Sequence, residues 1–116
     1  MLDRVTDRIR RLLPRRDAAA AAGARVPEVR LVGRRGCHLC DEARPVVARE
    51  CARVGARLQE ASVDDDPRLH AAYWDRIPVV EVDGRVVEQL RVDAERLRRV
   101  LAAAARGEGP AERLTW

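Results

Sequence analysis

The sequence predicts one α/β domain whose elements follow the order β-α-β-α-β-β-α. Two observations carry this prediction. The motif Cys37-His38-Leu39-Cys40 lies between a short apolar run and a long helical pattern, and Asp83-Gly84 separates two valine-rich runs. An Asp-Gly pair in that setting is typical of a two-residue β-hairpin. A chain of 116 residues is long enough for one domain with a hydrophobic core but not for two.

The first half of the chain is expected to form a strand and a long helix. Val29 to Val32 is a short apolar strand, and residues 33–36 form a loop because two glycines enclose two arginines. A helix then runs from about Cys37 to Val54 and stops at Gly55, and Pro45 inside it is expected to kink it. Its inward-facing side chains are predicted to be Cys40, Val47, Cys51 and Val54.

The second half contributes three strands and two helices. The elements are predicted at about Arg57 to Val63, Pro67 to Trp74, Ile77 to Val82, Arg85 to Glu88, and after Asp93. Asp66 and Asp93 should cap the two helices, because an aspartate side chain accepts hydrogen bonds from the free N–H groups of a first turn. We expect the first two strands to be parallel with a right-handed crossover, and the hairpin to be antiparallel.

The chain divides into three segments. Residues 1–25 are expected to form a basic amphipathic helix and an Ala/Arg-rich linker, residues 26–106 the folded domain, and residues 107–116 a tail. The helix is inferred from an apolar stripe before Pro14, made of Leu2, Val5, Ile9, Leu12 and Leu13. Such a helix either packs loosely or contacts a membrane surface or a partner.

Composition and charge narrow the range of functions. All 23 basic residues are arginines, and the net charge is +4. Because the arginines are interleaved with 19 acidic residues and no recognition motif accompanies them, we expect no nucleic-acid partner. No apolar stretch has the length of a secretory signal or of a transmembrane segment, so we expect a cytoplasmic location. In that compartment paired cysteines are typically catalytic or metal-binding.

Cys37 and Cys40 are the candidate catalytic residues. A helix N-terminus supplies unpaired N–H groups and a partial positive charge, and both stabilise a thiolate. The pKa of a free cysteine is about 8.5, and it falls to roughly 3.5–7.5 in such positions. We predict that the Cys37 thiolate attacks a disulfide and that Cys40, one turn deeper, resolves the mixed disulfide. The alternative is a zinc half-site, but the remaining ligand motif is absent, so we expect no metal.

Residues beside the motif are candidates for substrate binding. His38 either stabilises the Cys37 thiolate as an imidazolium or points to solvent. Arg34 either docks a substrate carboxylate or remains a solvated loop charge. Cys51 is expected to be a buried, small hydrophobic residue.

Three features resemble the thioredoxin fold, and the compact size resembles its glutaredoxin-like family. They are the Cys37-His38-Leu39-Cys40 motif at a strand-to-helix junction, Pro45 five residues after the second cysteine, and Ile77-Pro78 at the third strand. The resemblance implies a thioredoxin-like fold with a four-stranded mixed sheet flanked by helices. On this basis residues 26–106 are expected to form a glutaredoxin-like domain.

The resemblance also implies a substrate-binding role for Ile77 and Pro78. In this superfamily the corresponding X–Pro bond is cis and faces the reactive cysteine. Glutaredoxins commonly have Pro-Tyr between the cysteines and Gly-Gly near the glutathione site, where this chain has His38-Leu39 and Glu88-Gln89. Tyr73 and Trp74 either complete the apolar wall of the groove or cover the core.

The function implied is that of a monomeric dithiol thiol–disulfide oxidoreductase with a role in cell redox homeostasis. Its substrates would be protein or small-thiol disulfides, and its electron donor a thiol or a reductase. No bound cofactor is expected, although a thiol such as glutathione or mycothiol is a candidate co-substrate. Two alternatives stay open: a non-catalytic redox sensor or adaptor, and an iron–sulfur or metal carrier formed by dimerisation through Cys37.

Overall fold

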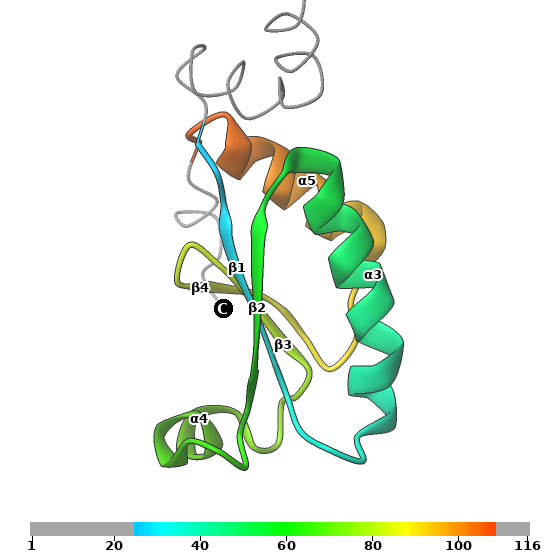
Figure 1. Ribbon diagram of the computed structural model, residues 1–116, viewed down its shortest axis with the longest axis vertical. Helices are drawn as coiled ribbons and strands as arrows, with labels where there is room; N and C mark the ends of the chain where they lie inside the picture. The colour runs from blue at the N-terminus through cyan, green and yellow to red at the C-terminus, as the bar shows by residue number, and fades with distance from the viewer. Residues whose placement is uncertain (1–24, 109–116) are drawn as a thin grey trace, which may run out of the picture.

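The structure, a computed structural model of the chain, describes residues 25–108. Within this range the elements follow the predicted order β-α-β-α-β-β-α (Figure 1). They are β1 (Glu28–Gly33), α3 (His38–Val54), β2 (Arg57–Ser62), α4 (Pro67–Tyr73), β3 (Val79–Val82), β4 (Arg85–Gln89) and α5 (Ala94–Ala105). The helix predicted at residues 2–13 and most of the predicted linker and tail lie outside the described residues.

The four strands form one mixed sheet in the order β2-β1-β3-β4. Strands β1 and β2 are parallel, whereas β3 is antiparallel to both β1 and β4, so the predicted pairings are confirmed. Val32, near the end of β1, pairs with Val79, the first residue of β3. The segment that follows β1 and the segment that precedes β3 therefore lie at the same edge of the sheet.

The hairpin between β3 and β4 is the tight turn that the sequence predicts. Asp83 and Gly84 both have positive φ, 51° and 82°, and the flanking Val82 and Arg85 are paired across the turn. Two consecutive residues with positive φ define a type I′ turn, whose twist matches that of the strands. The register of the hairpin shifts between Val80 and Glu81.

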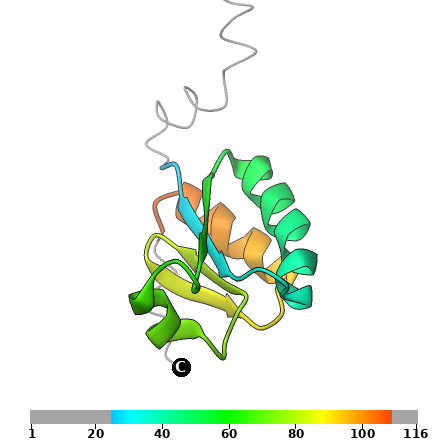
Figure 2. The same cartoon turned by 60° about the horizontal axis from the view of Figure 1, so that its bottom comes forward.

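Helices cover the two faces of the sheet unequally. Helices α3 and α5 lie together on one face and the short helix α4 lies on the other (Figure 2). On the first face, strand side chains pack with those of the two helices, forming a cluster of Val29, Leu31, Val80, Val82, Val87, Ala43, Val47, Cys51, Leu97, Leu101 and Ala104. On the second face, Leu69 of α4 packs with Val32 and Val79.

Helix α3 begins and ends as predicted. Cys37 is its N-cap, and Gly55 closes it in the left-handed conformation with φ 69°. Pro45 lies inside the helix. Buried side chains hold the helix against the sheet. Val47, for example, is 0% exposed.

The predicted inward-facing side chains of α3 all pack inward. Cys40, Val47 and Cys51 are buried, and the half-buried Val54 packs against the core cluster. The prediction missed Glu50, whose side chain is buried on the same face. The helical pattern alone predicts that a charged residue such as Glu50 is exposed. Glu50 is buried instead because Arg98 of α5 pairs with its carboxylate.

Several strand boundaries differ by one or two residues from those predicted, and two of these differences bear on the site. Gly33 belongs to β1 rather than to the following loop, and its carbonyl accepts the N–H of Val63 at 2.9 Å. β3 begins at Val79 rather than at Ile77. Pro78 has no N–H to contribute to a ladder, so the strand starts after it.

Candidate active site

Cys37 and Cys40 form a disulfide at the start of α3. The Cys37 backbone is extended, with φ −93° and ψ 113°, while the residues after it are helical. The Cys37 Sγ accepts the N–H of Cys40 at 3.2 Å, so the sulfur takes the place that a capping oxygen usually occupies. The first sulfur thus lies where the unpaired N–H groups of the helix converge.

The two cysteine residues differ in exposure. Cys37 is half-buried, whereas Cys40 is only 1% exposed. Cys40 packs in the cluster on the second face, together with Val32 and Ile77. An incoming molecule therefore has access to the first cysteine, while the second lies behind it against the sheet.

The Ile77–Pro78 peptide bond is cis, as the resemblance implies. Ile77 is 8% exposed and belongs to the cluster against which Cys37 packs. The register of β1 and β3 explains this proximity, because it brings the segment before β3 beside the segment after β1. Sequence reasoning thus singled out two segments, 40 residues apart, that the sheet brings to one edge.

Leu90 supports the segment that contains Pro78. Its N–H donates to the carbonyl of Pro78 at 2.9 Å and to that of Arg76 at 3.1 Å. Leu90 has φ 68°, a left-handed conformation that is uncommon for a residue other than glycine. Its side chain is 50% exposed. Sequence reasoning did not single out this residue, since no local pattern indicates a left-handed leucine.

His38 lies in solvent, as in the second of the two interpretations. Its side chain is 92% exposed, and Nε2 lies 3.5 Å from Oε2 of Glu42, one turn further along α3. This position favours a histidine that interacts with Glu42 over one that contacts the Cys37 sulfur.

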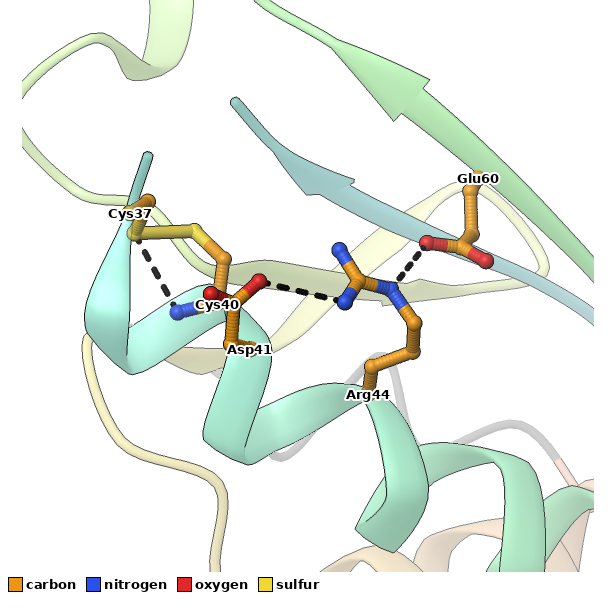
Figure 3. The surroundings of a disulfide bond; sticks show 5 residues. All are labelled: Cys37, Cys40, Asp41, Arg44 and Glu60. Atoms are coloured by element: carbon orange, nitrogen blue, oxygen red, sulfur yellow. Dashed lines mark hydrogen bonds and ion pairs between the residues drawn. A yellow bond between two sulfur atoms is a disulfide. The ribbon is translucent and has the colours of Figure 1, made fainter. Parts of the chain in front are cut away.

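A cavity of about 420 Å³ adjoins Cys40 between the loop after β1, the start of α3 and β2. Arg34 and Arg35 line it and are exposed, and neither forms an ion pair within residues 25–108. Arg44 of α3 also lines this cavity, and its guanidinium group binds two carboxylates. It contacts Asp41 at 3.2 Å and Glu60 of β2 at 2.8 Å (Figure 3).

A smaller cavity of about 220 Å³ lies on another side of α3. Its lining includes the apolar side chains of Leu39 from the redox motif, Leu90 and Val92. Glu42 and Arg91 supply charges at this cavity. It therefore offers an apolar contact directly beside the motif.

Tyr73 and Trp74 have different surroundings. Tyr73 packs against the second cluster, and its hydroxyl donates to Oε2 of Glu81 at 2.5 Å. Arg30 holds the other oxygen of Glu81 at 2.7 Å. Trp74 is 57% exposed and stacks on His70. Tyr73 thus covers the core, while Trp74 remains at the surface.

Glu88 and Gln89 occupy the place where glutaredoxins commonly have Gly-Gly. Glu88 is 1% exposed, and Arg96 of α5 contacts both of its oxygens at 2.6 and 2.9 Å. The N–H of Asp93 also donates to Glu88, at 2.9 Å. The carboxylate therefore fastens α5 and the chain before it to β4, and it is not available to a ligand.

Cys51, the third cysteine, is a free thiol and is 3% exposed. Burial raises the pKa of this thiol to about 11. It is buried among apolar residues, as predicted, and it packs in the cluster between α3 and α5.

The described residues hold neither a metal-ligand cluster nor a membrane-spanning helix. Among residues 25–108, no group of three or more His, Cys, Asp or Glu side chains lies in a position to hold a metal ion. In the same part of the chain, no helix combines the length and the apolar character needed to cross a membrane.

The fold and the disulfide together define a thioredoxin-fold protein with a Cys-x-x-Cys pair at the start of its first described helix. Residues 28–102 match the family model described as Glutaredoxin-like domain (DUF836). The chain belongs to this glutaredoxin-like family.

The chain is also similar to a mycobacterial protein and to solved structures. An uncharacterized protein of Mycobacterium tuberculosis (strain ATCC 25618 / H37Rv) is 34% identical over 93 residues, which cover 76% of this chain and 96% of the relative. The X-ray structure of a structural genomics target, XcR50 from X. campestris, is 40% identical with a TM-score of 0.55, over 66% of this chain and 97% of that one. A mutant thioredoxin from Halobacterium salinarum NRC-1 shares the fold at 24% identity and a TM-score of 0.53, over 68% and 74% of the two chains.

Proposed function

We propose that the protein is a dithiol thiol–disulfide oxidoreductase in which Cys37 is the nucleophile and Cys40 the resolving residue. One observation carries the proposal: the sulfur of the half-buried Cys37 accepts an N–H at the start of α3, while Cys40, which carries its partner sulfur, is buried. A helix N-terminus favours the thiolate form of the first sulfur, and the thiolate is the attacking species.

The reaction transfers two electrons and two protons from the protein to a disulfide. The Cys37 thiolate attacks one sulfur of the substrate, forms a mixed disulfide and releases the other sulfur as a thiolate, which takes up a proton. The Cys40 thiol then loses its proton and attacks the Cys37 sulfur, which releases the second substrate thiolate. The products are the Cys37–Cys40 disulfide and two substrate thiols. A thiol or reductase reverses the process and restores the dithiol.

The substrate is proposed to lie between the redox motif and the segment containing Pro78. The main chain of Ile77 and Pro78 would contact the substrate backbone, because both residues lie at the sheet edge that carries Cys37 and their side chains are buried. Arg34 would bind a substrate carboxylate, since it lies at the cavity beside Cys40 with no partner within residues 25–108. His38 would contribute only at the solvent side. Both a protein disulfide and a low-molecular-weight thiol disulfide fit these contacts.

The compartment and assembly state belong to the same proposal. We place the reaction in the cytoplasm, where the thiol pool can regenerate a dithiol. We also expect the monomer to be the active species, because Cys37, Cys40, Ile77 and Pro78 all come from one chain.

Trapping with single cysteine variants tests the assigned roles. Cys40→Ser should accumulate mixed disulfides with a disulfide reagent or with proteins, because the resolving thiol is missing. Cys37→Ser should accumulate none, and Cys51→Ser should behave like the unsubstituted chain. Mass spectrometry under non-reducing conditions reads out the adducts. The opposite trapping pattern would reverse the roles of the two cysteines.

Turnover separates the oxidoreductase from a redox sensor. The protein, supplied with a thiol donor and a small disulfide, should release many equivalents of reduced thiol per chain. A single equivalent of oxidation with no turnover would favour the sensor instead. The Cys37→Ser variant supplies the background rate.

A further inference from the structure

Gly33, the last residue of β1, faces the buried sulfur of the redox pair. A Cβ atom placed on Gly33 would lie 3.0 Å from the Sγ of Cys40 and 3.2 Å from its Cβ. Favourable contact between such atoms needs about 3.5–4.0 Å. Any side chain at position 33 would therefore push against Cys40.

The need for glycine here comes from space and not from backbone conformation. Gly33 is a strand residue outside the left-handed region, and its carbonyl is paired with the N–H of Val63 at 2.9 Å. An alanine could adopt this conformation at little cost. The absent Cβ is what allows the end of β1 to lie directly against the sulfur of Cys40.

We propose that Gly33 is a positioning residue that sets the dithiol–disulfide equilibrium of the Cys37–Cys40 pair. In the disulfide, the Cys40 sulfur is bonded to Cys37 and cannot turn away from position 33. In the dithiol, the Cys40 side chain can rotate, and the cavity of about 420 Å³ beside it gives the sulfur room. A methyl group at position 33 therefore opposes the disulfide more than it opposes the dithiol.

The inference rests on the proposed function only in that it concerns the same pair of cysteines. The equilibrium involves no physiological partner, so it can be measured whether or not the protein turns over a substrate. Dithiothreitol is a suitable probe: its two thiols pass two electrons and two protons to the Cys37–Cys40 disulfide. The products are the protein dithiol and cyclic oxidised dithiothreitol.

The test compares Gly33→Ala with the unsubstituted chain in buffers of defined reduced and oxidised dithiothreitol. We expect the equilibrium to shift at least about tenfold toward the protein dithiol, which corresponds to about 30 mV for a two-electron couple. Quantifying free thiols after acid quenching and alkylation gives the ratio. A shift smaller than twofold would overturn the proposal, because a merely structural role would weaken both redox forms equally.

Gly55→Ala is the matched control. Gly55 also ends an element, and a Cβ there meets no atom within 4 Å, but its φ of 69° makes alanine unfavourable. This variant should lose stability while keeping the equilibrium of the unsubstituted chain. An equal shift in both variants would assign the effect to general destabilisation and contradict the role of Gly33.

A second measurement covers the case in which Gly33→Ala does not fold. In a Cys40→Ala background the sulfur is absent, so the closer of the two contacts disappears. Adding Gly33→Ala there should leave a folded chain, and it should change the urea midpoint clearly less than it does in the oxidised chain that retains Cys40. The double variant could instead fail to fold, or Gly33→Ala could cost as much stability in it as in the chain that retains Cys40. Either result would show that Gly33 does not accommodate the Cys40 sulfur.

Discussion

Glu50 of α3 and Arg98 of α5 form a two-point ion pair between the two helices that cover one face of the sheet. Nε of Arg98 lies 2.9 Å from Oε1 of Glu50, and Nη2 lies 2.9 Å from Oε2. The Glu50 side chain is 1% exposed, and Arg53 approaches the same carboxylate at 3.3 Å. The helix that carries the redox motif is thus fixed to α5 by a buried carboxylate as well as by apolar packing.

Glu50→Gln should lower the free energy of unfolding by about 2 kcal/mol. Breaking a buried ion pair by removing one partner costs about 3–5 kcal/mol, and the half-exposed Arg98 reduces that cost because water can reach it. Glu28→Gln is a matched control, since its pair with Arg57 is exposed on both sides. It should cost less than about 1 kcal/mol. Urea unfolding at pH 7 measures both, and equal losses would show that burial of Glu50 is not decisive.

The stability difference between the unsubstituted chain and Glu50→Gln should shrink in acid. The Arg98 hydrogen bonds hold the pKa of Glu50 below its ordinary value of 4.5, although burial opposes them. A lowered folded-state pKa gives stability that is complete above about pH 4.5 and is lost as the pH falls through the lower value. Urea unfolding between pH 7 and pH 3 follows this change. A constant difference across that range would contradict it.

Tyr73, the single tyrosine of the chain, should ionise well above its ordinary pKa. Burial and the hydrogen bond to Glu81 raise the pKa of Tyr73 to about 12. A raised folded-state pKa gives stability that is complete below about pH 10 and is lost as the pH rises through about 12. Absorbance near 295 nm reports the phenolate directly. Glu81→Gln should lower the midpoint, and a native midpoint near 10 would contradict the buried position.

Cys51 should be inert in the folded protein. Its thiol is 3% exposed, and burial raises its pKa to about 11, so little thiolate forms near neutral pH. The oxidised protein should therefore show no titratable thiol with an aromatic disulfide reagent at pH 8, and one after denaturation. The Cys51→Ser variant should show none in either state. A fast-reacting thiol in the oxidised native protein would contradict the packing of Cys51.

Local signals account for the parts of the fold that the sequence predicted well. Asp66, Asp93 and Gly55 lie at helix ends because each satisfies backbone groups of its own neighbours. Asp83-Gly84 forms the hairpin because both residues adopt the positive φ that this turn requires. The placement of the Cys-x-x-Cys motif followed from residues adjacent to it in the chain.

The buried carboxylates could not be found in this way. Glu50 and Glu81 are held by arginines 48 and 51 residues away, and a chain with 23 arginines gives no local sign of which ones these are. Two glycines around two arginines predict a loop that includes Gly33, whereas its close contact with Cys40 arises only when α3 folds back against β1. The missed features of the site all depend on such contacts between distant elements.

The backbone N–H of Arg25 donates to the carbonyl of Ala105 at 2.8 Å. The beginning of the described domain and the end of α5 therefore lie together at one pole of the molecule. Figure 1 shows this pole at the end of the molecule away from the start of α3, where the two sulfurs lie. Tethering the described domain to an electrode or bead at Arg25 or Ala105 would therefore place the redox motif on the side away from the surface. The geometry suits the domain to surface-attached electrochemistry, and joining its two ends by a short linker would leave the thiol pair untouched.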